Sequence, residues 1–362
     1  MNLKTCDVSV VIPTWNAAPF LQEAVDSIWD QSSVPREIII VDDASTDDTT
    51  ELAAKLSMRS RVPFRVIKNE INSGSPARPM NIGIQAASAN LIAILDQDDV
   101  WTRHKLKQQV AVLDRMPEIN LVAGLFGFVG NEAKSVKHSA DWKSRLTKAM
   151  SNKGTWHECD GTNAFELFVK YENFVGGFPG FMFRRIDWQQ KGGFDESLRV
   201  AADFDFLCWL TQRGKAALIT ETHYFRREHD GNVTHSEVPR LTDVINILTR
   251  YISADQLKRH TRYRKALASK VLRLAQFFCL CDCHQQARQM MRLFYRIRKR
   301  RLDLLLMPAH YGQFAIMPFL QDFLQLRHLP KVSQAEAANC VESVIDLLRR
   351  TESGPEKVGG LP

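Results

Sequence analysis

The feature that most limits how this chain can fold is a short apolar run that ends in carboxylates. Residues 90–99 read NLIAILDQDD, so a strand is followed at once by Asp96, Asp98 and Asp99. Three acids within four residues repel one another, and at the mouth of a buried strand they favour a bound cation. Taken alone, the stretch is equally consistent with a solvated turn and an aspartate cap before a helix over 100–116.

Strands and helices alternate around this run. β-branched and apolar runs predict strands, and apolar residues three and four apart predict helices. This rhythm predicts an α/β fold with a mainly parallel sheet and helices on both faces. The strands are expected over 8–13, 37–41, 64–68, 91–95, 120–130 and 218–227, and the helices over 19–31, 49–56, 79–88 and from 201 onward. The stretch 131–160 is polar, Lys-rich and weakly patterned, and it is expected to be an insertion near the acceptor side.

Polar side chains follow three of the predicted strands. Their carboxyl ends carry Thr14-Trp15-Asn16, Asp42-Asp43 and the three acids. Ligands of open α/β sheets bind beyond these ends, so an aromatic face, two hydrogen-bond acceptors and a cation site would share one edge. That inventory predicts a nucleoside-diphosphate site. Neither a P-loop nor a G-x-G-x-x-G motif is present to explain it otherwise.

Four motifs in this order resemble the family 2 glycosyltransferases with the GT-A fold, a Rossmann-like α/β architecture. They are Val10–Asn16, Ile40–Asp47, Arg78–Gly83 and Leu95–Asp99. The resemblance implies a metal-dependent, inverting transfer of a sugar from a nucleotide-sugar donor to a hydroxyl of a glycan or lipid-linked acceptor. The chain lacks the Q-x-x-R-W element of the processive synthases, which favours addition of a single sugar.

The resemblance also implies roles in binding the donor. Pro13 and Trp15 would border the base, and Asp43 would accept a hydrogen bond from its ring N–H. Arg78 would lie near the donor phosphates. The donor-binding residues implied in this way are Pro13, Thr14, Trp15, Asn16, Asp42, Asp43, Arg78, Asn81 and Asp96.

For the cation, the resemblance makes Asp96 and Asp98 the D-x-D element, with Asp98 or Asp99 as the direct ligand of Mn2+ or Mg2+. A divalent cation stabilises the charge that develops on a leaving diphosphate, and oxygen ligands suit Mg2+ or Mn2+ better than zinc. A loop over 226–234 resembles one that closes the catalytic domain in this family, which makes His229 a further candidate ligand. The alternative is a surface histidine in a turn.

The candidate general base follows a second matching element, the GGFDE sequence at 192–196. The helix after it contains Asp203, which would take the proton from the acceptor hydroxyl as that oxygen attacks the anomeric carbon. Ala202 replaces the glutamate usual in the family, and Asp205 is a fallback base. The alternative is that both acids only stabilise the start of the helix through its dipole.

The charge is unevenly distributed along the chain. Residues 1–239 contain 27 Lys and Arg against 31 Asp and Glu, whereas residues 240–362 contain 21 against 10. We expect a catalytic domain over 1–239, a basic helical extension over 240–350 with amphipathic helices at 262–278 and 285–305, and a disordered end over 351–362. The 240–330 region could meet an anionic membrane surface, and the alternative is an ordinary helical subdomain.

Seven cysteines and an N-terminus without an apolar signal-peptide core favour a reduced, cytoplasmic setting, with peripheral attachment to the membrane. Cys279, Cys281, Cys283 and His284 are too closely spaced for a zinc-finger pattern, so buried thiols are preferred to a structural metal.

The function predicted is single-sugar transfer in surface polysaccharide or lipopolysaccharide synthesis. A nucleotide-sugar-binding module that has lost catalysis is the first alternative, since Ala202 departs from the family pattern. A nucleic-acid binder using the basic tail is the second, and it is disfavoured because no recognition module is present. The sequence leaves the donor sugar and its base, the acceptor and the oligomeric state open.

Overall fold

The computed structural model describes residues 5–154, 156–172, 175–229, 237–281, 283–298 and 333–353. It divides the chain into two compact units, Met1–Asp230 and Gly231–Pro362. The boundary expected after residue 239 falls inside α9 (Glu237–Tyr251), a helix of the second unit.

The first part of the chain forms one half of the sheet, in which all strand pairs are parallel. Four strands lie in the order β3-β2-β1-β4, and α1, α2 and α3 connect them. The strands are β1 (Thr5–Thr14), β2 (Val34–Asp42), β3 (Phe64–Lys68) and β4 (Leu91–Ile94), and the helices are α1 (Leu21–Trp29), α2 (Thr49–Arg59) and α3 (Ala77–Ala86). The predicted strands and helices of this half are confirmed.

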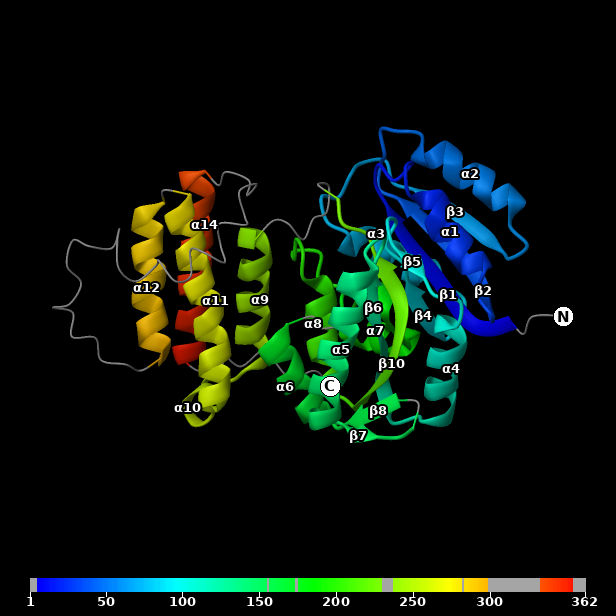
Figure 1. The fold of residues 1–362 in the computed structure, drawn as a ribbon. Coiled ribbons are helices and arrows are strands. Elements are labelled where there is room, and N and C mark those ends of the chain that lie inside the picture. The colour runs from blue at the N-terminus through cyan, green and yellow to red at the C-terminus, as the bar shows by residue number, and fades with distance from the viewer. Residues whose placement is uncertain are drawn as a thin grey trace. The chain divides into compact units, whose positions relative to one another are not determined.

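The other half of the sheet is mixed. An antiparallel strand, β9 (Phe181–Arg184), lies between β4 and β6 (Ile119–Phe128). Strand β10 (Lys215–Arg226) pairs in parallel with β6. The short strand β5 (Val100–Trp101) pairs antiparallel with the end of β10. The sheet has helices on both faces, which confirms the predicted α/β class (Figure 1). The remaining elements here are α4 (Lys105–Arg115), α6 (Gly161–Tyr171), the 3-10 turn η1 (Phe178–Gly180), α7 (Arg185–Lys191) and α8 (Ala202–Thr211).

The weakly patterned stretch 131–160, for which the sequence predicts no helix or strand, has regular secondary structure. This stretch forms α5 (Glu132–Ala149), β7 (Ser151–Asn152) and β8 (Trp156–Cys159), and β8 pairs antiparallel with β10. The Asn131 side chain caps α5 by accepting a hydrogen bond from the Lys134 N–H at 3.0 Å. Most described side chains of α5 are exposed, so its apolar pattern is too weak to read from sequence.

Apolar side chains of the central strands form the core of the first unit. Val10, Ile12, Ile38 and Ile40 are all fully buried. Helix α3 packs so closely on β1 that a Cβ on Gly83 would lie 2.4 Å from a Val11 methyl carbon. The close packing fixes where each strand ends, and therefore where the polar residues after each strand lie.

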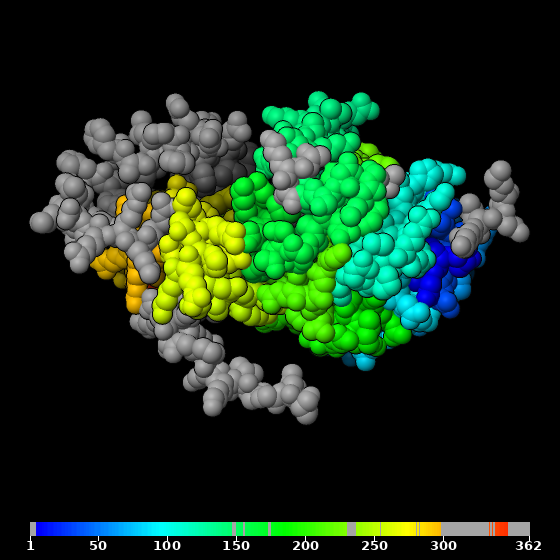
Figure 2. All heavy atoms as spheres, turned by 90° about the horizontal axis from the view of Figure 1, so that it is seen from below, coloured from blue at the N-terminus to red at the C-terminus, as the bar shows by residue number. Residues whose placement is uncertain are grey.

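All the secondary-structure elements described in the second unit are helices, which confirms the predicted helical extension. Its helices are α9, α10 (Ala254–Arg259), α11 (Thr261–Leu280), α12 (His284–Arg298) and α14 (Gln334–Ser353). The spheres of α11 and α12 are yellow to orange in Figure 2. Among the described helices none is both long and apolar enough to cross a membrane.

Two expectations for the end of the chain concern residues that are described only in part. Helix α14 extends to Ser353, so the first residues of the expected disordered end are helical, and the Gly354-Pro355 pair follows directly. Residues 354–362 lie outside the described part of the chain. So do residues 299–305, the end of the second expected amphipathic helix.

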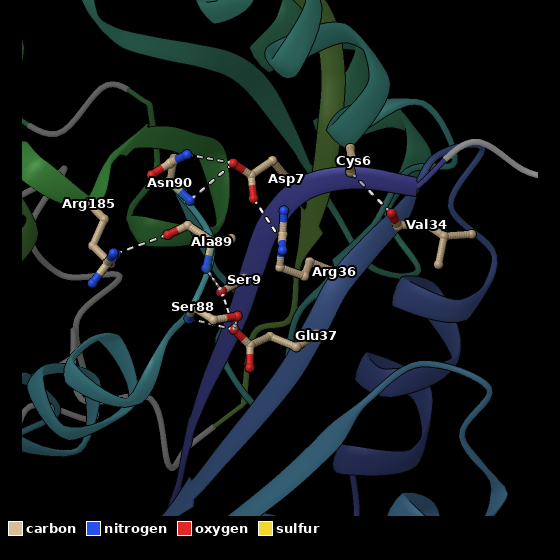
Figure 3. A network of polar contacts seen from close by, with 10 residues as sticks. All are labelled: Cys6, Asp7, Ser9, Val34, Arg36, Glu37, Ser88, Ala89, Asn90 and Arg185. Carbon is tan, nitrogen blue, oxygen red and sulfur yellow. Dashed lines mark hydrogen bonds and ion pairs between the residues drawn. The ribbon is translucent and has the colours of Figure 1, made fainter.

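A buried carboxylate ties three segments together at the amino-terminal edge of the sheet (Figure 3). Glu37 is 5% exposed and accepts hydrogen bonds from the Ser9 hydroxyl at 2.7 Å and the Ser88 N–H at 2.7 Å. Burial alone would raise the pKa of Glu37, but the hydrogen bonds from Ser88 and Ser9, with the Arg65 guanidinium, lower it to about 2. Glu37 therefore stabilises the fold in its ionised form.

Replacing Glu37 should reveal how much its ionised side chain contributes to the free energy of unfolding. Because the pKa falls from 4.5 when unfolded to about 2 when folded, the stabilisation is complete above pH 4.5 and disappears as the pH falls toward 2. We expect Glu37→Gln to lower the free energy of unfolding by about 2–3 kcal/mol at pH 7, and by less at pH 3, in urea titrations. Glu70→Gln, at an exposed position, is the control. An equal loss at both pH values would contradict the assignment.

Candidate active site

The acids that follow β4 form a tight turn at the carboxyl edge of the sheet. The Asp99 N–H donates to the Asp96 carbonyl at 3.2 Å, and Asp99 is 5% exposed. Strand β5 begins at the next residue and pairs with the end of β10, where Val100 faces Phe225. The turn is thus fixed between β4 and the residues that follow β10.

Those following residues contact the acids directly. The Arg227 N–H donates to Asp99 Oδ1 at 3.0 Å, and its Nε donates to the Asp98 carbonyl at 3.1 Å. His229 Nε2 lies 2.9 Å from Asp98 Oδ2, and its ring stacks on Phe20 with centroids 4.8 Å apart. The structure therefore brings together Asp98 and His229, which the sequence separates by more than a hundred residues.

The acids disfavour one another's charge. Burial, followed by the charges of Asp98 and Asp203, raises the pKa of Asp96 to about 8, and Arg226 offsets part of this effect. Burial and the charges of Asp96 and Asp98 also raise the pKa of Asp99. A cation placed among these carboxylates would favour their charged forms and lower both pKa values.

The donor set fits Mn2+ or Mg2+, because carboxylate oxygens with an imidazole nearby suit a hard divalent ion. No trio of Asp, Glu, His or Cys side chains in the described residues is already arranged to hold a metal ion. Such ions commonly take only one or two protein carboxylates and complete their shell with phosphate oxygens and water. Asp98, with Asp96, Asp99 or His229, therefore remains the predicted ligand set.

The candidate base lies close to these acids. Asp203 is in the first turn of α8, partly buried, and its Oδ1 accepts from the Phe204 N–H at 2.7 Å. Asp203 is among the charges that raise the pKa of Asp96. A Cβ on Gly177 would lie 3.6 Å from Asp203 Oδ2, so a residue without a side chain borders this carboxylate.

The fallback base, Asp205, is placed differently. Its side chain is 0% exposed, and Oδ2 forms an ion pair with Lys191 Nζ at 2.7 Å. A base must reach the acceptor hydroxyl, and a buried carboxylate held by a lysine cannot. Asp205 is thus a structural acid, and its proposed role as an alternative base is corrected.

The nucleotide end of the site is built around an exposed tryptophan. Trp15 is 52% exposed, and its backbone N–H and carbonyl are both bound by the Gln97 side chain, at 2.7 and 3.1 Å. Asp43, predicted to receive the base, is 4% exposed and accepts from Asn69 Nδ2 at 2.7 Å and from the Ser73 N–H at 2.9 Å. These contacts hold the carboxylate in place and leave it one further acceptor direction on Oδ1.

Other predicted donor-binding residues hold the loops together. Asp42 is fully buried and accepts from the hydroxyls of Ser45 and Thr50, so it orders its own loop. Asn16 has a positive φ of 50° and its Oδ1 accepts from the Thr46 N–H at 2.8 Å.

The last four predicted donor-binding residues differ in exposure. Pro13 is buried, and the Thr14 hydroxyl donates to the Val41 carbonyl at 3.3 Å. Arg78 is exposed in the first turn of α3. The Asn81 carboxamide is fully occupied by residues 188–196.

Sequence reasoning missed several residues that shape the site. Gln97 lies between two predicted functional acids, but its contact is with a backbone 82 positions earlier. Arg227 contacts the acids through its backbone N–H and its guanidinium Nε, which a motif search does not detect. Gly176 has a φ of 83°, and a Cβ there would lie 2.2 Å from the buried Tyr224 hydroxyl. The Gly-rich composition of 176–180 was the one signal available.

Residues 9–174 match the family model described as glycosyl transferase family 2. Over these residues, which make up less than half of the chain, the sequence is similar to glycosyl transferase family 2. The chain is 32% identical over 108 residues to the poly(ribitol-phosphate) beta-N-acetylglucosaminyltransferase TarS of Staphylococcus aureus, a match that covers 29% of this chain and 18% of TarS. It is 38% identical over 105 residues to the putative teichuronic acid biosynthesis glycosyltransferase TuaG of Bacillus subtilis, covering 28% of this chain and 40% of TuaG. The matches thus span less than two thirds of these curated relatives.

The fold of the chain is also similar to solved structures. The crystal structure of S. aureus TarS 1–349 matches with a TM-score of 0.56 at 18% identity, covering 97% of this chain and 92% of that chain. The same TarS region in complex with UDP-GlcNAc matches with a TM-score of 0.54. At this identity the likeness concerns the fold.

A buried polar network supports the glycine-rich turn of the first unit. Gln109 donates through Nε2 to the Gly180 carbonyl at 2.9 Å and accepts from Lys105 Nζ at 2.8 Å. Lys105 is fully buried, its ammonium lies 4.3 Å from the Trp101 ring centroid, and burial lowers its pKa to about 7. No described carboxylate forms an ion pair with it.

This lysine should make stability pH-dependent. Between pH 7 and 10.5 the unfolded chain binds a proton at Lys105 that the folded chain does not, so folding becomes more favourable as the pH rises. We expect Lys105→Met to remove this rise, which is at most about 1.4 kcal/mol per pH unit, in urea titrations at pH 7 and 9. Lys107→Met, at an exposed position on the same helix, should keep it. Equal slopes in both variants would refute the assignment.

Proposed function

We propose that this protein is an inverting, metal-dependent glycosyltransferase that moves one sugar from a nucleotide-diphosphate sugar to a hydroxyl of a glycan or lipid-linked acceptor. The observation that carries the proposal is the electrostatic arrangement of the site. Asp203 lies near enough to the D-x-D acids to raise the pKa of Asp96, so a candidate base and a candidate cation site share one edge of the sheet. The match to the family model and the exposed Trp15 support the same conclusion.

The residues divide the work between donor and acceptor. Trp15 offers a flat face to the base, and Asp43 offers a fixed acceptor for a ring N–H. Asp98, with its neighbouring acids and His229, would hold Mn2+ or Mg2+, which supplies positive charge to the departing diphosphate. Asp203 takes the proton from the acceptor hydroxyl as that oxygen attacks the anomeric carbon from the face opposite the diphosphate, which inverts the configuration.

The relatives guide the choice of donor and pathway. TarS has been solved with UDP-GlcNAc, and TuaG is named for teichuronic acid biosynthesis, so a UDP-sugar and a surface polysaccharide are the first substrates to test. A lipopolysaccharide-type acceptor belongs to the same class of surface glycan.

The alternative is a nucleotide-sugar-binding module without catalysis. Ala202 stands where the family usually has glutamate, and its side chain is 2% exposed. Donor binding would occur in both cases, so only turnover in the presence of an acceptor separates them.

Two variants test the proposed mechanism. Asp203→Asn should lower the rate of sugar transfer by at least about a hundredfold, because the base is lost, while the dissociation constant for UDP stays within about twofold. Asp98→Ala should weaken the Mn2+-dependent binding of UDP by at least about tenfold, because a cation ligand is lost. Transfer would be measured with radiolabelled UDP-GlcNAc and binding by calorimetry. Full transfer by the Asp203→Asn protein would exclude this base, and metal-independent UDP binding would exclude the cation site.

The second unit offers a basic surface for a membrane. Residues 261–298 contain nine Lys and Arg against one acid. On α12 four basic residues, His284, Arg288, Arg292 and Arg296, recur every fourth position and are exposed. Like charges at this spacing destabilise a helix slightly, so an anionic partner would stabilise it. The apolar residues Ala287 and Met290 are buried, so the described part of α12 offers charge rather than an apolar face for insertion.

We therefore propose peripheral, electrostatic attachment to anionic lipid on the cytoplasmic membrane face. The protein should sediment with phosphatidylglycerol vesicles at 50 mM salt and much less at 500 mM. Arg288→Glu/Arg292→Glu should weaken sedimentation by at least about tenfold, at roughly 1 kcal/mol per charge. Lys55→Glu/Arg61→Glu, an exposed pair in the first unit, is the control. Equal sedimentation with neutral vesicles, or none with either kind, would contradict this proposal.

A further inference from the structure

One asparagine joins the donor-side helix α3 to the segment that leads into the helix of the candidate base. Asn81 Nδ2 donates to the Phe194 carbonyl at 3.0 Å and to Glu196 Oε1 at 2.9 Å. Its Oδ1 accepts from the Phe194 N–H at 2.8 Å and from Trp188 Nε1 at 3.0 Å. Both donors and both acceptor directions of the carboxamide are used, so its chemistry is directed to residues 188–196 and not to a ligand.

The neighbouring glycine requires this close approach. Gly193 has a φ of 92°, and a Cβ on it would lie 3.2 Å from Asn81 Oδ1. A side chain here would both strain the backbone and crowd the carboxamide. The Gly192-Gly193 pair therefore lets the chain turn directly against α3. Ser75 adds a second link, because its hydroxyl donates to the Leu198 carbonyl at 3.0 Å.

The same segment is tied to α8 by a buried ion pair. Lys191 Nζ donates to the Gly193 carbonyl at 3.3 Å and lies 2.7 Å from Asp205 Oδ2. Asp205 lies two residues after Asp203 in α8, and its side chain is fully buried. Because a buried acid and its lysine cannot move independently, Lys191 fixes the first turn of α8 relative to Gly193.

Aromatic packing stiffens this connection. The Phe194 ring contacts Phe206 of α8 at a centroid distance of 5.1 Å and Phe178 of η1 at 4.8 Å. Phe194 is 3% exposed and Phe206 is fully buried. Phe194, whose backbone N–H and carbonyl both bond to the Asn81 side chain, is thus packed against the helix that carries Asp203.

We infer that Asn81 is a positioning residue for the candidate base. It acts through Phe194 and Gly193, then through Lys191 and Asp205, to hold Asp203 opposite the donor. This rests on the proposed function in one respect, namely that Asp203 is the base. Displacement of a catalytic group by about 1 Å can lower a rate a hundredfold, so a small movement of α8 would be enough to reduce transfer.

The variant that tests this keeps the shape of the side chain. Asn81→Asp retains the acceptor for the Phe194 N–H but sets a carboxylate oxygen against the Phe194 carbonyl and Glu196. We expect kcat for transfer from UDP-GlcNAc to fall about 10- to 100-fold, with KM for the donor and Kd for UDP within about twofold of wild type. Adding Glu196→Gln supplies a donor to the new carboxylate and should restore at least about fivefold of kcat.

Amide hydrogen exchange tests the link between Asn81 and α8 without requiring sugar transfer. Exchange at residues 201–206, which include the Phe204 N–H bound to Asp203, should speed up in Asn81→Asp and slow again in the double variant. Asn90→Ala is the matched control, since it loses a hydrogen bond to Asp7 at the opposite edge of the sheet. It should leave both kcat and this exchange unchanged.

The outcomes separate the inference from the proposed function. An unchanged kcat and unchanged exchange at 201–206 in Asn81→Asp would overturn the inference, as would an equal loss of kcat and UDP affinity, which indicates general unfolding. If wild type transfers no sugar, the proposed function fails, whereas faster exchange in Asn81→Asp alone would still support the mechanical link.

Discussion

The repulsion among the carboxylates at the end of β4 is the constraint on which the site depends. The turn from Asp96 to Asp99 is held by the backbone N–H and the guanidinium Nε of Arg227, which follows β10, and by the pairing of β5 with that strand. These contacts do not neutralise the acids, since the pKa of Asp96 stays at about 8 because of burial and its acidic neighbours. The fold therefore maintains unfavourable electrostatics at one point of an otherwise well-satisfied sheet, as functional sites often do.

Much of the first unit could be predicted because its local and global signals agree. Buried parallel strands are continuous apolar runs, so β1 to β4 could be predicted from the sequence. The polar residues after these strands mark the ligand-binding edge, so the turn of acids could be predicted as well. α5 and β8 could not, because a helix with mostly exposed side chains and a short edge strand leave little periodicity. The antiparallel insertion of β9 depends on packing between distant segments, which periodicity does not encode.

Site residues were predicted by type better than by role. Asp42, Asp43 and Asn81 were all assigned to the donor, but Asp42 and Asn81 direct their polar atoms into the protein. Motif matching shows that such residues matter and does not distinguish a contact with a ligand from a contact that shapes a loop. Gln97 shows the converse, because its function is visible only when Trp15 is beside it.

What distinguishes the acids of this edge is how each charge is compensated. Asp42 and Asp43 are satisfied by hydroxyl, amide and backbone donors, and Asp205 by a buried lysine. Burial and acidic neighbours raise the pKa values of Asp96 and Asp99, and the positive charge of Arg226 offsets only part of this effect. Fixed donors stabilise a structural acid in its charged form, and a cation bound at this edge would do the same for Asp96 and Asp99. Two acids of α8 also differ in burial: Asp205 is fully buried and paired with Lys191, whereas Asp203, two residues earlier, is only partly buried.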